Sequence, residues 1–191
     1  MGRADTIFQY SGPPFAACLS CPPMPMLRLL IAALALCAAT LAHADDAADA
    51  QRLLQGGHPD AALARAEASL AQRPNDATLR FTRAVALMDL GRDAEALDAF
   101  QRMTQDYPEL PEPYNNLGLL YARGGQLEEA RVALETALRN DPSHRVARRN
   151  LGDVLLRLAL QAWEAADAAQ PGDPELQRRI RVGRELATSP R

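Results

Sequence analysis

Residues with reactive side chains are few in this sequence, and the clearest candidates are two cysteines near its start. Cys18 and Cys21 have the C-x-x-C spacing of redox and zinc-binding pairs. The sequence contains no second pair, and no alternating strand and helix pattern surrounds this one. We therefore assign the pair no function. Cys37 follows Leu36 in a stretch similar to a lipoprotein cleavage box, but such a box needs a small residue at position 36, so lipidation of Cys37 stays open.

The histidines and serines also lack the spacing of a catalytic or metal site. His58 and His144 stand in a predicted turn and a predicted loop, and neither belongs to an H-x-x-x-H pair. Ser69, Ser143 and Ser189 lack the strand-turn-helix context of a nucleophile. The sequence therefore predicts a protein that is not an enzyme and that has no catalytic residue, no metal and no cofactor.

An apolar run at residues 29–42 follows Arg28 and precedes Ala44. A basic residue, an apolar run and an A-x-A site in this order predict a secretory signal peptide, with cleavage after Ala44. The run is shorter than the roughly 20 residues that span a membrane. We therefore expect no stable membrane span once the signal is removed.

The length of the segment before this run points to a later start of translation. A signal peptide that begins at Met24 or Met26 has an ordinary length, whereas one that begins at Met1 has a long basic region. We expect residues 24–44 to be the signal peptide. Residues 1–23 are then a mis-start or a disordered leader.

The charged residues indicate the source of the protein and the class of its partners. All 21 basic residues are arginine, which is typical of a GC-rich bacterial genome. Together with the signal peptide, this predicts a Gram-negative periplasmic protein. Basic clusters interleaved with aromatic residues are absent from the sequence, so we expect no nucleic-acid partner.

Charge is unevenly distributed between two parts of the chain. Residues 45–144 contain 10 arginines and 17 acidic residues, a net charge of −7, whereas residues 145–191 contain 9 arginines and 6 acidic residues, a net charge of +3. This difference either steers a charged partner or belongs to solvated faces.

The elements that would position any functional side chain repeat every 34 residues. Gly57, Gly91 and Gly125 share this interval with a set of prolines and four sets of small or apolar residues. These sets are Pro74, Pro108 and Pro142; Ala62, Ala96 and Ala130; Ala50, Ala84, Gly118 and Gly152; Leu53, Leu87, Tyr121 and Leu155; and Ala66, Phe100 and Leu134. A 34-residue period with glycine turns predicts stacked helix-turn-helix units.

On these columns, residues 45–144 resemble three tetratricopeptide repeats: 45–76, which is degenerate, 77–110 and 111–144. The first departs from the family pattern at Asp49 and Ala66, and the second at Arg83. The resemblance implies an all-α fold, a right-handed α-solenoid of about three helical hairpins. We expect a fused long helix and a C-terminal capping helix to complete it.

The repeat pattern breaks in the fourth unit, after the part that corresponds to the first helix of a hairpin. Residues 145–171 contain no turn glycine at position 159, and their apolar residues form one stripe, so we expect a fused unit with one helix from about Val146 to Ala169. The second-helix pattern returns five residues early. It comprises Ala159, Trp163, Ala166 and Pro171.

Residues 172–191 predict a second, shorter helix and a tail. Asp173 is the expected N-cap and Pro174 the first helical residue. Capping of the solenoid is the first interpretation of this segment, and docking of an anionic partner on its arginines is the alternative.

The family resemblance also implies a concave groove lined by the first helix of each unit. The matching residues are Phe81, Thr82, Val85, Asp89, Asn115, Asn116, Leu119, Arg123, Arg149, Asn150, Asp153 and Arg157. We expect Asn116 and Asn150 to project into this groove together and hold the backbone of an extended peptide; the alternative is bonding between helices. The arginines could bind acidic side chains or a C-terminal carboxylate.

Some family members use basic residues and an asparagine in this groove to clamp the acidic C-terminus of a chaperone. The corresponding positions here do not carry that set: they are Ala47, Gln51, Thr82, Glu112 and Asn116. The sequence therefore does not predict this clamp.

These observations lead to a hypothesis about function. We expect a periplasmic, non-catalytic module that binds a protein or peptide in its groove, in envelope assembly or quality control. The alternative is a scaffold, a homo-oligomer that self-associates through its fused C-terminal unit. An enzyme accessory with its own catalysis would require an activity that depends on His58 or His144.

Overall fold

The computed structural model describes residues 46–188 of the chain. The predicted leader at residues 1–23, the signal peptide at 24–44, its cleavage after Ala44 and the lipidation of Cys37 lie outside the described residues.

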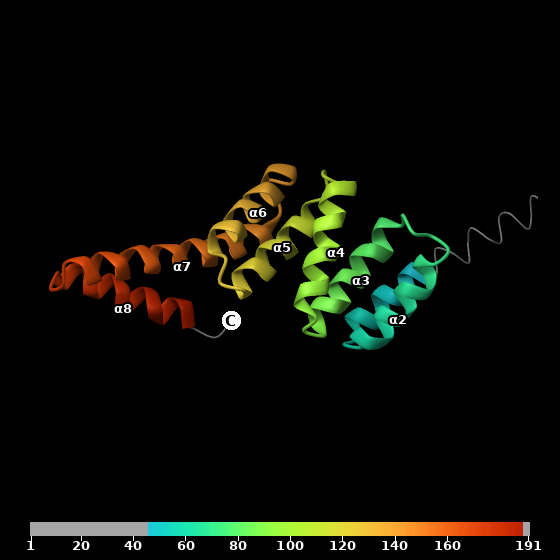
Figure 1. Cartoon of the computed structure of the whole chain (residues 1–191), viewed down its shortest axis with the longest axis horizontal. Coiled ribbons are helices and arrows are strands. Elements are labelled where there is room, and N and C mark those ends of the chain that lie inside the picture. Colours follow the sequence, from blue (N-terminus) through green and yellow to red (C-terminus); the bar gives the residue numbers. More distant parts are fainter. Residues whose placement is uncertain (1–45, 189–191) are drawn as a thin grey trace, which may run out of the picture. The chain divides into compact units, whose positions relative to one another are not determined.

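The described residues form helices and no strands, as the all-α prediction requires (Figure 1). Residues 46–55 are helical, and seven further helices follow in chain order. These are α2 (Pro59–Leu70), α3 (Ala77–Asp89), α4 (Asp93–Asp106), α5 (Pro111–Arg123), α6 (Leu127–Asn140), α7 (Arg145–Ala169) and α8 (Pro174–Thr188). No helix among residues 46–188 is both long and apolar enough to cross a membrane.

The three repeated glycines take the backbone conformation that the turns require. Gly57, Gly91 and Gly125 have φ angles of 74°, 71° and 79°, in the left-handed region where a side chain is strained. Each lies between the two helices of one hairpin. Repetition of one conformation at a 34-residue interval gives the three hairpins the same turn.

Side chains and prolines set where several helices begin. The carboxylate of Asp76 accepts a hydrogen bond of 3.0 Å from the backbone N–H of Leu79 and so caps α3. Asp173 accepts from the N–H of Glu175 at 2.9 Å, as its predicted role in α8 requires. Pro111 and Pro174 are the first residues of α5 and α8, where a missing N–H costs no helical hydrogen bond.

Small residues in the repeat columns let neighbouring helices approach closely. A methyl group on Gly118 would lie 2.5 Å from Cγ of Leu134, so α5 and α6 meet at a distance that only glycine allows. Ala84, Ala96 and Ala130 are completely buried at the corresponding helix contacts. At these positions the columns inferred from the sequence are therefore packing positions.

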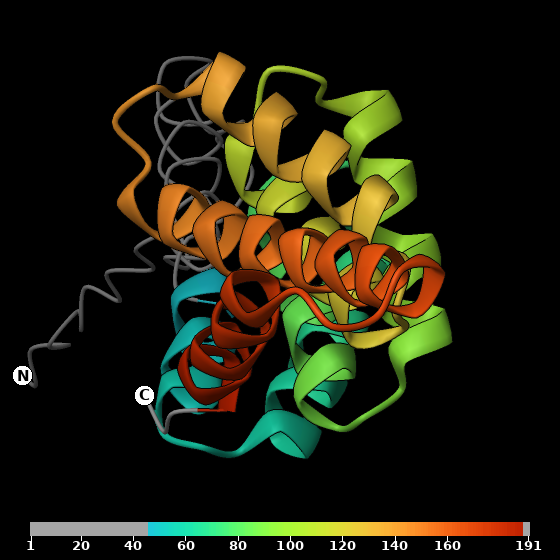
Figure 2. The same ribbon diagram turned by 90° about the vertical axis from the view of Figure 1, so that its left-hand side faces the viewer.

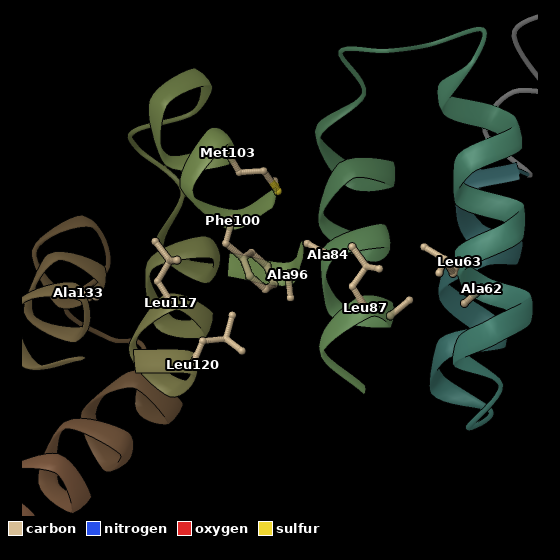
Figure 3. Close-up of a cluster of buried hydrophobic side chains, with 11 residues drawn as sticks. Ala62, Leu63, Ala84, Leu87, Ala96, Phe100, Met103, Leu117, Leu120 and Ala133 are labelled. Atoms are coloured by element: carbon tan, nitrogen blue, oxygen red, sulfur yellow. The ribbon is translucent and has the colours of Figure 1, made fainter. Parts of the chain in front are cut away.

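The core continues from one hairpin into the next. Phe100 is completely buried and meets Phe81 edge to face, with ring centroids 5.8 Å apart. Figure 3 shows Phe100 between Ala84 and Leu87 on one side and Leu117 and Leu120 on the other. From α2 to α8 each helix packs against the next along the chain, and α5 also packs against α7.

The C-terminal part departs from this regular order as predicted. The expected fused helix is α7, which runs without interruption from Arg145 to Ala169. The chain turns back at Gly172, which has a φ of 107°, and α8 lies beside the C-terminal part of α7 in both views (Figures 1 and 2). Gly183 of α8 packs against Leu160 and Trp163 of α7.

Candidate interaction site

The inner surface, as we name the twelve predicted groove residues, is supplied by three helices. Helices α3 and α5 contribute eight of the twelve and α7 contributes four. Helix α5 packs against α6 and α7, so it holds the middle of this surface in place. The twelve residues differ widely in exposure, and this decides which of them can meet a ligand.

Eight of the twelve side chains reach solvent at least in part. Phe81, Val85 and Leu119 are half-buried apolar residues, and Asp153 is a half-buried carboxylate. The exposed members are Asp89, Arg123, Arg149 and Arg157. The accessible part of the inner surface thus combines apolar side chains with charges of both signs.

Four members are buried and form hydrogen bonds within the fold. Thr82, with 1% of its surface exposed, donates to the backbone oxygen of Thr78 at 2.8 Å. Asn116 donates from Nδ2 to the backbone oxygen of Glu112, one helical turn earlier, at 3.0 Å. Asn150, 3% exposed, donates from Nδ2 to Oδ1 of Asn115 at 2.9 Å. These groups are satisfied without a ligand.

Asn116 and Asn150 are both buried and each donates to a group within the fold, so the expectation that they project into the groove together is wrong. Asn150 pairs with Asn115 instead, and the bond joins α5 to α7. This is the helix-to-helix bonding that the sequence left open as the alternative. The physical reason is rotation about the helix: Asn115 faces the neighbouring helix, and Asn116 is close enough to its own backbone to bond there.

Two of the three arginines of the inner surface are also engaged. Arg123 forms an ion pair with Asp93 at 2.6 Å, across α5 and α4. Arg157 donates from Nη1 to the backbone oxygen of Ala122 at 2.7 Å, near the end of α5, where carbonyl groups lack helical partners. Arg149 forms no ion pair with any described residue. It is therefore the arginine of this set that is free to bind an acidic group.

A small cavity of about 70 Å³ lies between α5 and α7 on the inner surface. Leu119, Asn150, Asp153 and Arg157 are among the residues that line it. The cavity is too small for a folded partner, but it can accept one side chain of a bound segment. Apolar and charged groups meet at its walls, so it suits a side chain with an apolar stem and a polar end.

Two larger hollows lie beside the second helices α4 and α6, where the sequence analysis expected none. One, of about 490 Å³, is lined by Tyr114, Tyr121 and Val132 among others, and Val132 is 52% exposed. The signal in the sequence was an apolar residue among polar ones on α6, at the positions Glu128, Glu129, Val132 and Thr136.

The other hollow, of about 570 Å³, is rich in charges that are already paired. Arg80 bonds to Asp106 at 2.6 Å and lies over the ring of Tyr107. Arg102 pairs with Asp98 at 3.0 Å. A ligand here would have to displace these ion pairs, which makes the hollow a weaker candidate than the inner surface.

The two described histidines each lie directly before a helix. His144 accepts a hydrogen bond at Nδ1 from the N–H of Ala147 and so begins α7. His58 precedes α2 in the first turn. Within residues 46–188, no three histidine, cysteine or acidic side chains are close enough to hold a metal ion.

Sequence profiles of the tetratricopeptide repeat match this chain in two places. One matches residues 41–111 and the other residues 111–144, and together they cover more than half of the 191 residues.

Solved structures of this class have similar folds. The first TPR domain of Spaghetti (RPAP3), bound to the HSP90 peptide SRMEEVD, is 20% identical with a TM-score of 0.57, over 61% of this chain and 93% of that one. The second TPR domain of human RPAP3, in complex with the HSP70 peptide SGPTIEEVD, is 20% identical with a TM-score of 0.53, over 59% and 94%. TTC0263, a thermophilic TPR protein of Thermus thermophilus, is 23% identical with a TM-score of 0.58, over 77% and 83%.

Proposed function

The chain belongs to the tetratricopeptide repeat family, and from this premise we propose that it is a protein-interaction module whose inner surface binds an extended segment of a partner. The observation that carries the proposal is that half-buried Phe81, Val85 and Leu119 lie on successive first helices with the exposed Arg149, which forms no ion pair with a described residue. Apolar contacts give such a site affinity, and a free arginine fixes the position of one acidic group.

Peptide complexes of similar structures support this assignment. The RPAP3 domains hold peptides of HSP90 and HSP70. The residues of this chain do not favour the same ligand, because no basic residue stands at the five positions with which family members clamp a chaperone tail. These positions are Ala47, Gln51, Thr82, Glu112 and Asn116. We therefore propose a segment with apolar side chains and one acidic group, either a carboxylate side chain or a C-terminus.

The residues of the inner surface have different roles in this proposal. The buried Asn115–Asn150 bond holds α5 and α7 together, so the backbone of a bound segment does not depend on it. The cavity beside Leu119 takes one side chain of the segment, and Arg149 takes the acidic group. The module acts by shape and charge, and the proposal includes no catalytic step.

The cellular setting is part of the proposal and follows from the sequence. The basic residue, apolar run and A-x-A site before Ala44 favour export, and a chain whose 21 basic residues are all arginine favours a GC-rich bacterium. We place the module in the periplasm of a Gram-negative bacterium, as an adaptor in envelope assembly or protein quality control.

Photocrosslinking from two positions tests the binding surface. A photoreactive residue replaces Leu119 on the inner surface in one variant and Glu129, an exposed residue of α6, in the other. After expression in a Gram-negative periplasm, we expect one discrete partner to be captured from position 119 and not from 129. The same products from both positions, or a product from 129 alone, would contradict the proposal.

A charge variant then tests the role of Arg149. With the captured partner, Arg149→Glu should weaken binding by roughly tenfold, because a charge-assisted contact becomes a repulsion. Arg181→Glu is the matched control, since Arg181 is also exposed, forms no ion pair with a described residue and lies on α8. Equal losses in both variants would assign the effect to net charge and remove Arg149 from the site.

A further inference from the structure

Helix α7 has an empty position where a tetratricopeptide hairpin places its second helix. Gly152 belongs to the same column as Gly118, the residue against which Leu134 packs. A methyl group on Gly152 would meet no atom outside its own helical turn within 4 Å. Glycine at position 152 would let another helix pack closely against α7, but no helix among the described residues does so there.

An exposed apolar face extends from this position along α7. Leu155 is 46% exposed, and Ala162, Ala166 and Ala169 continue at helical spacing and are exposed as well. Helix α8 adds Val182 and Leu186, which are 42% and 61% exposed. Four of the five large hydrophobic side chains exposed in the described residues lie on α7 and α8: Val146, Leu155, Val182 and Leu186. Exposed apolar side chains concentrated on two adjacent helices mark a candidate interaction surface.

The segment that would fill the empty position is present on the same helix but cannot reach it. The second-helix pattern begins at Ala159, and α7 continues straight through this point to Ala169. A straight helix cannot fold back on its own first half. The second half of α7 from another molecule can occupy the position instead, as in domain swapping.

The place of the missing helix sets the arrangement of two such helices. The empty position lies beside the first half of α7, at Gly152, and the second-helix pattern begins in the second half, at Ala159. Two molecules that each place the second half of α7 on the first half of the other hold these helices antiparallel. The acidic residues of the second half belong to the contact with α8 instead, because Glu164 pairs with Arg184 and Asp167 lines the hollow between α7 and α8.

We propose that the chain forms a two-fold symmetric dimer in which the α7 helices of two molecules pack antiparallel across Gly152 and Leu155. The two-fold axis passes near Arg157, the middle residue of the helix. Gly152 then lies opposite Ala162 of the second molecule and Leu155 opposite its Ala159. At 1.5 Å per residue the 25-residue helix is about 37 Å long, enough for a contact that also reaches Val182 and Leu186 of α8.

Sedimentation velocity at several concentrations tests the dimer with the purified protein, whose N-terminus is first identified by mass spectrometry. We expect a reversible dimer without added ligand. Leu155→Glu should weaken it by about a hundredfold or more, since two charges enter one apolar contact. Val132→Glu is the matched control, because Val132 is 52% exposed on α6, outside the contact, and this variant should dimerise as the parent does.

A second apolar position tests the antiparallel register. Ala162→Glu should weaken the dimer by about tenfold or more, because position 162 lies opposite Gly152 of the second molecule in this register. A dimer that Leu155→Glu leaves intact would overturn the proposal, and so would one that Ala162→Glu leaves intact. A monomer at all concentrations would also overturn it and would leave a helix of another protein as the occupant of this face. Capture from position 119 should persist in the Leu155→Glu monomer, so this test and that of the inner surface fail independently.

Discussion

Gly118 and Gly152 occupy the same column of the repeat and have opposite surroundings. Gly118 lies so close to Leu134 that a methyl group would overlap its side chain, whereas Gly152 faces open space. The first belongs to a regular hairpin and the second to a helix that continues where a turn was expected. A small residue in this column thus permits two helices to pack closely. The segment that follows in the chain decides whether the second helix comes from the same molecule.

The regular and irregular regions should differ most in the cost of removing a large apolar side chain. Phe100→Ala deletes a completely buried ring between two hairpins and should lower the free energy of unfolding by about 3–5 kcal/mol. Leu155→Ala, at a side chain 46% exposed, should lower it by less than about 1 kcal/mol in the monomer. Urea denaturation at low protein concentration measures both. Similar losses would contradict the difference in packing.

Amide side chains give a second, smaller contrast. Asn150→Ala leaves the buried Oδ1 of Asn115 without its donor and should cost about 1–3 kcal/mol of unfolding free energy. Asn116→Ala removes only a bond to the backbone of its own helix and introduces a better helix former, so its cost should be below about 1 kcal/mol. The same urea experiment compares them, and the reverse order would mean that the α5–α7 bond does not stabilise the fold.

The smallest expected effect concerns acid and α8. Hydrogen bonds from Arg178 and then Arg179 lower the pKa of Glu175 from 4.5 to about 2. Because the folded pKa is depressed, the contribution of Glu175 is present above pH 4.5 and is lost as the pH falls towards 2. Far-UV circular dichroism should show a small loss of helix in this window that Glu175→Gln lacks. If both proteins lose the same amount of helix as the pH falls, Glu175 does not stabilise α8 in this way.

Much of the fold follows from spacing in the sequence. The glycine interval predicts three turns with positive φ, and Gly57, Gly91 and Gly125 have it. The absence of glycine at position 159 predicts the continuous α7. These inferences succeed because turn conformation and helix continuity depend on local residue types.

Less of the candidate site follows from the sequence, because it depends on rotation and distance. Family positions place Asn115 and Asn116 together, but the direction of each side chain decides that Asn115 meets Asn150 and that Asn116 bonds to its own helix. The pairing of Arg123 with Asp93 joins residues 30 positions apart, and no spacing rule foresees it. The pattern thus identifies the surface, and side-chain contacts decide which of its members are free.

The direct test of the contrast between the two regions is the unfolding free energy of two glycine variants, measured in urea at a concentration where the protein is monomeric. Gly118→Ala should lower it by about 1–3 kcal/mol, because Leu134 must move. Gly152→Ala should raise it by about 0.5–1 kcal/mol, because an exposed helical glycine gains helix propensity without a clash. Opposite signs are the predicted result. A loss of stability in both variants would show that a helix already covers Gly152 and would contradict the account.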